Sequence, residues 1–102
     1  MILKNKVVWV TGASSGIGEA ITFALAKEGC KLVISARRKE ELERVKQATN
    51  LSDDNILVLP IDLEQYQKAN EWTKTVMDKF NRIDILINNG GISQEGLALN
   101  TT

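Results

Sequence analysis

The sequence contains no histidine and only one cysteine, Cys30. Without histidine, Ser-His-Asp and Cys-His catalysis are excluded, and the commonest metal ligand is missing. Because one cysteine cannot complete a structural zinc site, we predict no metal centre. A single cysteine also cannot form an internal disulfide, which favours a reducing, intracellular setting.

The sequence also lacks a surplus of charge and any apolar run long enough to cross a membrane. Thirteen basic residues balance thirteen acidic ones, whereas nucleic-acid or anionic-membrane binding needs a basic excess. The opening residues, MILKNKVVWV, lead straight into a strand and leave no room for a signal peptide. We therefore expect no nucleic-acid partner and no membrane segment in this chain. The expected location is the cytoplasm, or the endoplasmic reticulum if the complete protein has an anchor elsewhere.

What is present is one small α/β domain. The chain has 102 residues, of which 43% are apolar, enough for a single core. Four nearly continuous runs rich in Val and Ile alternate with helical segments, which is typical of a parallel sheet buried on both faces. The predicted strands are residues 6–10, 31–35, 56–59 and 83–87, and the predicted crossover helices are residues 16–28, 39–49 and 64–80.

The predicted helices differ in their apolar faces. Gly29 follows the first helix, where a C-cap glycine belongs. The second carries a thin apolar stripe, Leu42 and Val45, and should be largely exposed. The third has a sustained apolar face, which places the only tyrosine, Tyr66, in the core.

Four strands are fewer than a complete doubly wound sheet contains. Such a sheet has the order 3-2-1-4-5-6, and this chain stops shortly after its fourth strand. We therefore predict a partial doubly wound (Rossmann) parallel sheet with the order 3-2-1-4. The single domain, residues 1–102, would be truncated on its C-terminal side. The open edge of the fourth strand would lead to a homo-oligomer or to association with another chain.

A glycine-rich loop, TGASSGIG, connects the first predicted strand to the first helix. Gly12 would permit a tight turn, Gly16 would let the backbone approach a phosphate, and Gly18 would let the helix pack closely. The helix N-terminus would offer N–H groups to a pyrophosphate, with Ser14 and Ser15 adding hydroxyl donors. The alternative is a turn of small residues in which Ser15 is an ordinary N-cap. A P-loop is excluded because the Gly-Lys-Ser/Thr ending is missing.

The spacing T-G-x-x-x-G-x-G, together with NNGG after the fourth strand, resembles the short-chain dehydrogenase/reductase family. The glycine motif is matched at Thr11, Gly12, Gly16, Ile17 and Gly18. The Asn-Asn-Ala-Gly motif is matched at Asn88, Asn89 and Gly91, with Gly90 in place of alanine. The resemblance covers the whole chain, but only the N-terminal, cofactor-binding part of the family. The stretches VVWVTGASSGIGE and RIDILINNGGISQ look like the dehydrogenase/reductase member-seven branch, a group of membrane-associated reductases.

The NNGG segment would form the far wall of a dinucleotide site. In a doubly wound sheet the fourth strand lies beside the first, opposite the glycine loop. Asn89 could then bond backbone or ribose, Asn88 could brace the strands, and Gly90 would leave room for the ribose. A hairpin turn is the alternative interpretation, but the residues that follow are poorly patterned as a second strand.

The end of the second predicted strand favours NADP(H) over NAD(H). An NAD site usually has an acidic residue there, but this chain has Ala36, followed by Arg37 and Arg38. A guanidinium can grip a 2′-phosphate that an acid would repel. The resemblance implies that Arg37 is the main contact, supported by Arg38 and Ser14. The alternative is that these arginines simply begin a charged helix.

Two residues after the third strand complete the predicted cofactor set. The resemblance implies that Asp62 bonds the adenine amino group and that the backbone of Leu63 contributes. Asp62 also fits an N-cap of the third helix, with Gln65 completing a capping box. Both roles are compatible.

No catalytic residue can be assigned in this chain. The family uses a Ser, an Asn and a Tyr-x-x-x-Lys pair, but the fourth residue after Tyr66 is Asn70. The resemblance therefore implies an NADP(H)-dependent oxidoreductase, acting on a small carbonyl or alcohol substrate, whose catalytic residues lie beyond Thr102. The chain alone would bind the cofactor weakly and be inactive. A non-catalytic nucleotide-binding module, or a structural half-domain that pairs with another chain, are the alternatives.

Overall fold

A computed structural model describes residues 3–89 of the chain, apart from the side chain of Leu63. Its elements follow the order β1 (Val7–Thr11), α1 (Gly16–Lys27), β2 (Lys31–Ser35), α2 (Lys39–Thr49), β3 (Ile56–Val58), the 3₁₀ helix η1 (Leu63–Lys68), α3 (Ala69–Phe80) and β4 (Ile85–Asn88). All neighbouring strands are parallel, in the order β3-β2-β1-β4. The predicted fold class and strand order are therefore confirmed.

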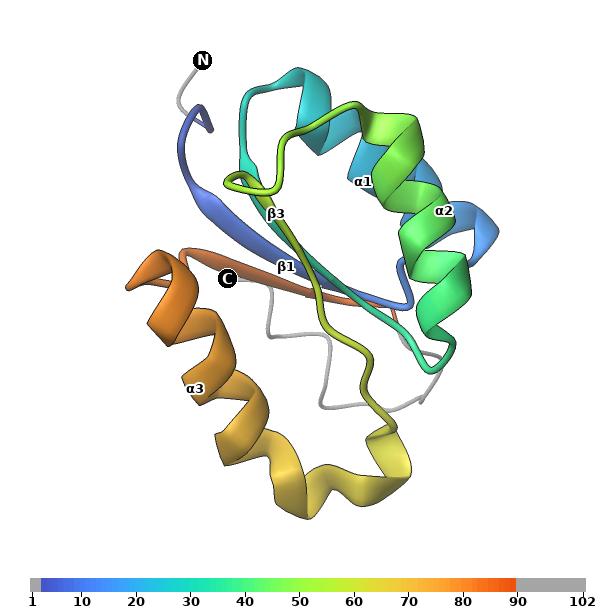
Figure 1. Cartoon of the computed structure of the whole chain (residues 1–102), viewed down its shortest axis with the longest axis vertical. Coiled ribbons are helices and arrows are strands. Elements are labelled where there is room, and N and C mark those ends of the chain that lie inside the picture. Colours follow the sequence, from blue (N-terminus) through green and yellow to red (C-terminus); the bar gives the residue numbers. More distant parts are fainter. Residues whose placement is uncertain (1–2, 90–102) are drawn as a thin grey trace.

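The sheet is covered on both faces (Figure 1). Helices α1 and α2 pack on one face, where Leu42 and Val45 join strand residues such as Val10 and Leu32. Helix α3 packs on the other face, where Val76 meets a second set of buried strand residues, Val7, Trp9 and Val33. Every residue of β1 is buried, as expected for the central strand of a two-sided parallel sheet. Leu42 and Val45 are the buried stripe of α2 that the sequence predicts.

The register brings the carboxyl ends of three strands to the same level. Thr11 at the end of β1 pairs with Ser35 of β2 on one side and with Asn88 of β4 on the other. The loops that follow these strands therefore emerge together at one edge of the sheet. Within residues 3–89, no strand pairs with the outer edge of β4.

Helix α1 ends as its sequence predicts. Gly29 has a φ of +84°, a left-handed conformation that favours glycine. Its N–H donates to Ala26 O, and Cys30 N–H donates to Leu25 O. These two bonds form a Schellman motif, which satisfies the last carbonyls of the helix. Cys30 is then buried, and burial, with a smaller effect of Glu28, raises the pKa of its thiol.

The third predicted helix is not continuous, and the expectation for Tyr66 is wrong. The segment begins as η1, and Gln65 there has non-helical angles (φ −105°, ψ 44°). The α-helix starts only at Ala69. The kink separates Tyr66 from the apolar stripe of Trp72, Val76 and Phe80. Tyr66 is therefore 75% exposed instead of lying in the core.

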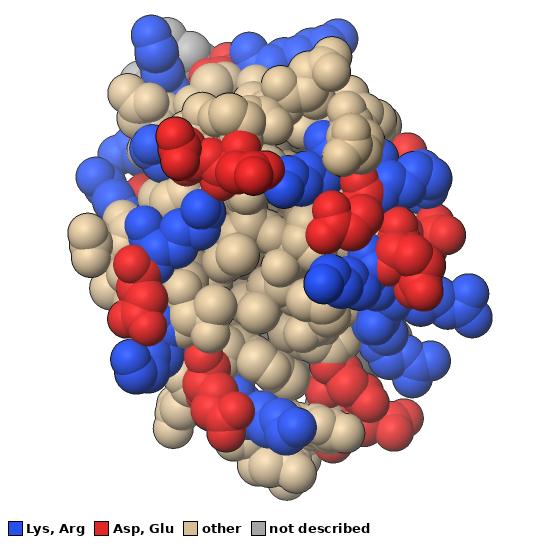
Figure 2. Space-filling view, in the orientation of Figure 1, with Lys and Arg blue, Asp and Glu red and all other residues tan. Residues whose placement is uncertain are grey.

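Charged side chains of both signs are interspersed on the surface shown in Figure 2, as the balanced composition implies. Within residues 3–89, no helix has the length and apolarity that crossing a membrane requires.

Asp84, the residue before β4, forms hydrogen bonds with Val7, the first residue of β1. Its Oδ2 atom accepts from Val7 N at 2.8 Å, and its backbone N–H donates to Val7 O at 2.9 Å. Arg82 Nη2 lies 2.7 Å from Asp84 Oδ1. The hydrogen bond from Arg82, followed by the bond from Val7, lowers the pKa of Asp84.

We expect Asp84→Asn to lower the free energy of unfolding by about 1 kcal/mol at neutral pH, because it weakens charge-assisted bonds. Since the pKa of Asp84 is lowered in the folded state, its contribution is complete above the unfolded pKa of about 4. That contribution is lost as the pH falls through the lower, folded pKa. Urea unfolding should therefore separate wild type from variant at about pH 7 and bring them together in acid.

Asp78→Asn is the matched control. Asp78 forms an exposed pair with Lys74, so its loss should change stability little. Equal stability of wild type and Asp84→Asn at neutral pH would contradict the role given to Asp84.

Candidate functional site

The glycine loop after β1 has a different requirement at each of its glycines. Gly12 has a φ of +66°, which makes the tight turn. A Cβ atom on Gly18 would lie 2.0 Å from Gly12 O and 2.9 Å from Asn89 Nδ2, so only glycine lets α1 pack this close. A Cβ on Gly16 would meet no atom of the described residues within 4 Å. Gly12 and Gly18 are therefore needed by the protein itself, whereas Gly16 keeps the space outside the loop open.

Ser15 is the N-cap residue of α1, but its side chain is turned away from the helix. Ser15 Oγ donates to Gly12 O at 2.9 Å and accepts from Asn89 Nδ2 at 3.3 Å. Within the described residues, it forms no side-chain cap bond to α1. The uncapped N–H groups of the first turn can therefore serve an anion, which the dipole of the helix also favours.

Two other predicted site residues flank the N-cap residue Ser15 in the sequence. Ser14 is partly exposed, and Ile17 in the first turn of α1 is 69% exposed. An apolar side chain that projects beside uncapped N–H groups could cover part of a bound ligand.

The end of β4 is tied to the glycine loop, as the sequence predicts for Asn88 and Asn89. Thr11 Oγ1 donates to Asn88 Oδ1 at 3.0 Å and accepts from Asn89 N at 3.0 Å. The Asn89 side chain lies 3.5 Å from Gly12 O. Gly90, also predicted for this wall, lies outside the described residues.

A depression of about 280 Å³ lies where the chain leaves β2 and β3. It brings together Arg37, which follows β2, and Asp62, which precedes η1. The remaining lining residues are Pro60, Ile61, Gln65, Lys68 and Trp72. Arg38 does not line this depression but is the N-cap residue of α2. The two predicted arginines therefore lie in different places: Arg37 lines the depression, and Arg38 is the N-cap residue of α2.

Asp62 is an N-cap residue, as its sequence context predicts, but it caps η1 and not the α-helix that follows. Its Oδ1 atom accepts from Glu64 N at 3.0 Å, and its carbonyl accepts from Gln65 N at 2.8 Å. Leu63 is the first residue of η1. Because the cap uses Oδ1, the second carboxylate oxygen stays available to a ligand in the depression.

A comparison with protein families matches residues 6–102 to the short chain dehydrogenases. The chain belongs to this family. Dehydrogenase/reductase SDR family member 7 of Mus musculus is 54% identical over 103 residues, which are 97% of this chain and 30% of the mouse protein. The crystal structure of a short chain dehydrogenase from Bacillus anthracis superposes with a TM-score of 0.81 at 40% identity, covering 86% of this chain and 35% of that one. This short-chain dehydrogenase sequence thus spans about a third of the length of the relatives that it matches.

Two other solved family members carry different nicotinamide cofactors. A 3-ketoacyl-(acyl-carrier-protein) reductase from Brucella melitensis is complexed with NADH; it is 34% identical, with a TM-score of 0.73, over 82% of this chain and 34% of that one. An alcohol dehydrogenase from Thermococcus sibiricus is complexed with 5-hydroxy-NADP; it is 32% identical, with a TM-score of 0.73, over 81% of this chain and 36% of that one. Family membership therefore implies a nicotinamide dinucleotide without choosing between its two forms.

Three residues near the site of this short-chain dehydrogenase could not be predicted from the sequence. Arg44 of α2 forms two bonds of 3.2 Å with Glu19 in the first turn of α1. These bonds raise the pKa of Arg44 and partly neutralise an acid beside the proposed anion site. Lys68 and Trp72 line the depression from η1 and α3. No local motif marks these three residues, because only the packing of distant elements brings them to the site.

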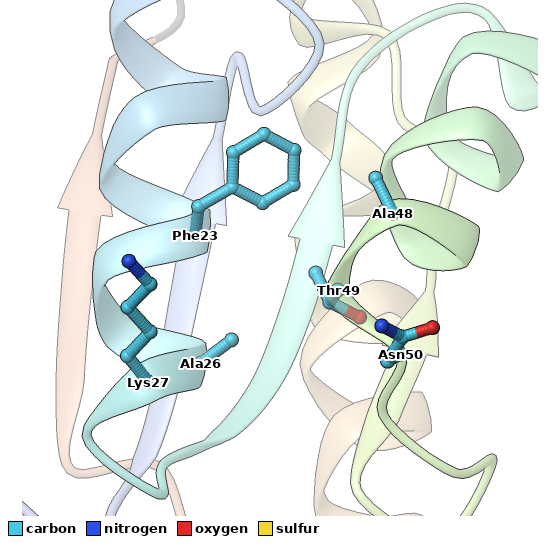
Figure 3. A pocket seen from close by; sticks show the side chains of 6 residues that line it. All are labelled: Phe23, Ala26, Lys27, Ala48, Thr49 and Asn50. Carbon is cyan, nitrogen blue, oxygen red and sulfur yellow. The ribbon is translucent and has the colours of Figure 1, made fainter.

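A larger groove of about 470 Å³ lies between α1 and α2 and contains none of the predicted cofactor residues. Figure 3 shows the ring of Phe23 extending from α1 toward α2, where Ala48 and Thr49 line the other side. Its volume does not make it the functional site, because the glycine loop and the carboxyl ends of the strands lie elsewhere.

Proposed function

We propose that this chain is the cofactor-binding part of an NADP(H)-dependent oxidoreductase that transfers hydride between the nicotinamide and a small carbonyl or alcohol substrate. Membership of the short-chain dehydrogenases supports a dinucleotide. The choice of NADP(H) rests on one observation: Arg37 lines the depression at the carboxyl ends of β2 and β3, and the preceding residue is Ala36 instead of an acid.

The phosphates and the adenosine end of the proposed cofactor can be assigned to predicted residues. The pyrophosphate would lie at the N-terminus of α1, over the open face of Gly16. The adenosine end would lie near Asp62 and Leu63, with its 2′-phosphate paired to Arg37 and supported by Arg38 and Ser14. Asn89 would border the ribose from β4, and Gly90 would leave room beside it.

The cofactor itself supplies the hydride chemistry. The residues of this chain bind and orient it: N–H groups and guanidinium charge hold the phosphates, and the bonds among Thr11, Asn88 and Asn89 keep the two walls together. We propose that the Ser, Tyr and Lys that act on substrate are encoded after residue 102, so that this single domain is the first part of a larger one. The outer edge of β4 would then pair with a further strand or with another copy of the chain.

Binding measurements test this proposal. The complete natural protein and this chain are each titrated with NADPH and with NADH, and binding is followed by calorimetry. The affinity for NADPH should be at least about tenfold higher than the affinity for NADH. In Gly16→Val, the added side chain fills the open space, so affinity for both dinucleotides should fall about tenfold or more without loss of stability. Ala24→Val, exposed two turns further along α1, controls for the cost of a β-branched residue in the helix.

Binding of neither dinucleotide, or equal binding by Gly16→Val, would refute the proposal. Tighter binding of NADH would refute the choice of NADP(H). A natural gene that ends at codon 102, without a downstream Tyr-x-x-x-Lys, would instead favour a non-catalytic module.

A further inference from the structure

A buried polar contact connects β1 and β2 just behind the candidate site. Trp9 Nε1 donates to Ser35 Oγ at 2.9 Å. Trp9 is 7% exposed and Ser35 is fully buried. Removing one member of a buried polar pair lowers the stability of the protein, because the polar group that remains is buried without a hydrogen-bond partner.

The geometry of the strands explains why these two residues meet. Trp9 pairs in register with Val33, and Ser35 lies two positions further along β2 on the same face of the sheet. The indole therefore reaches diagonally toward the carboxyl end of β2. Its ring packs in the cluster on the α3 side, which Trp72 also joins.

Ser35 lies at the junction of the glycine loop and the segment that carries Arg37. Its carbonyl accepts from Ala13 N at 3.0 Å, and the next carbonyl, of Ala36, accepts from Ile61 N at 3.0 Å. These bonds leave Arg37 as the first residue past the fixed backbone, and its side chain lines the depression that Trp72 also lines. The indole bond therefore fixes the side chain of Ser35, the residue whose carbonyl is the first of these two anchors.

We propose that Trp9 and Ser35 are positioning residues that hold Arg37 where it meets the 2′-phosphate, and so set the preference for NADPH over NADH. This inference rests on the function proposed above. Neither residue touches the cofactor. They act through the backbone of residues 35–37, which a free Ser35 side chain would allow to shift.

Three variants of the complete natural protein test this role: Trp9→Phe, Ser35→Ala and the double variant. The measurements are thermal unfolding and the dissociation constants of NADPH and NADH. Each single variant should weaken NADPH binding about three- to tenfold, since a charge-assisted contact depends on alignment. NADH binding should change less than about twofold, because NADH has a neutral 2′-hydroxyl where NADPH has a charged phosphate.

The double variant separates positioning from stability. It has the same cavity at position 9 as Trp9→Phe but no unpaired hydroxyl, so its melting temperature should exceed that of Trp9→Phe. Its NADPH affinity should nevertheless stay low, because nothing restores the bond that fixes Ser35. A purely structural pair would instead recover both properties together.

An unchanged ratio of NADPH to NADH affinity in Ser35→Ala and the double variant overturns the inference, whatever happens to the melting temperature. Equal weakening of both cofactors overturns it too. If Trp9→Phe does not fold, Ser35→Ala provides the same comparison. Failure of the proposed function is seen earlier, as absent NADPH binding or preferred NADH binding by the wild-type protein.

Discussion

Replacing Gly18 with alanine is expected to lower the free energy of unfolding by about 3 kcal/mol or more, as overpacking against fixed backbone does. The added Cβ would lie 2.0 Å from Gly12 O and 2.8 Å from Gly12 C. Neither atom belongs to a flexible side chain that could move aside. The start of α1 would have to lift from β1, which would also open the contact between Asn89 and the loop.

Gly16→Ala is the matched control, since the same methyl group is added two residues earlier in the same helix. Apart from residues 15–17 and the adjacent backbone of α1, no described atom lies within 4 Å of that methyl, and alanine is the better helix former. Its stability should equal that of wild type or exceed it by up to about 1 kcal/mol. Urea unfolding of the two variants measures the contrast, and similar stabilities would show that α1 is not packed as closely as described.

The sheet of this protein could be predicted because its signals are local and repeated. Continuous Val and Ile runs indicate buried parallel strands, and their alternation with helices fixes the class of fold. The range predicted for the second helix matches α2, Lys39–Thr49, and the sequence marks its C-terminal end. Asn50 there adopts the left-handed conformation that ends helices.

The third helix could not be predicted from periodicity alone. A 3.6-residue repeat places Tyr66 with Trp72 and Val76 on one face of a helix, but it contains no information about where the helix begins. The Asp62 carboxylate binds Glu64 N and starts a tight 3₁₀ turn instead. A competing local hydrogen bond therefore displaced the expected helix by more than one turn.

Some residues of the candidate site could likewise be predicted from local sequence, and others could not. The roles predicted for Gly12 and Gly18 agree with their geometry, because a glycine requirement is a property of the backbone at one position. Lys68, Trp72 and Arg44 reach the site only through the packing of η1, α3 and α2. Their positions depend on distances between elements, which a single sequence does not encode in any short motif.

The end of β1 connects both sides of the site. Thr11 binds Asn88 and Asn89 of the β4 end, and Trp9, two residues earlier, binds Ser35 of β2. One central strand thus holds the end of β4 through a hydroxyl and, as proposed above, the Arg37 segment through an indole. The dinucleotide would lie across the loop that follows the same strand.

Arg37→Asp is expected to change the ratio of NADPH to NADH affinity by about 100-fold in favour of NADH, which corresponds to about 3 kcal/mol. The substitution removes the cation proposed to pair with the 2′-phosphate and replaces it with an anion that would repel that phosphate. The new carboxylate can instead accept a bond from the ribose 2′-hydroxyl of NADH. Asp62, which lines the same depression, adds to the repulsion.

Two comparisons make this prediction specific to Arg37. Arg37→Gln removes the charge without adding one, so its effect on the ratio should be intermediate. Lys4→Asp makes the same change of charge before β1, at the opposite edge of the sheet, and should leave the ratio unchanged. Because the contact is between charges at an exposed site, raising the salt concentration should weaken NADPH binding to wild type more than it weakens NADPH binding to Arg37→Gln. Unchanged NADPH affinity in Arg37→Asp would show that the depression does not hold the 2′-phosphate.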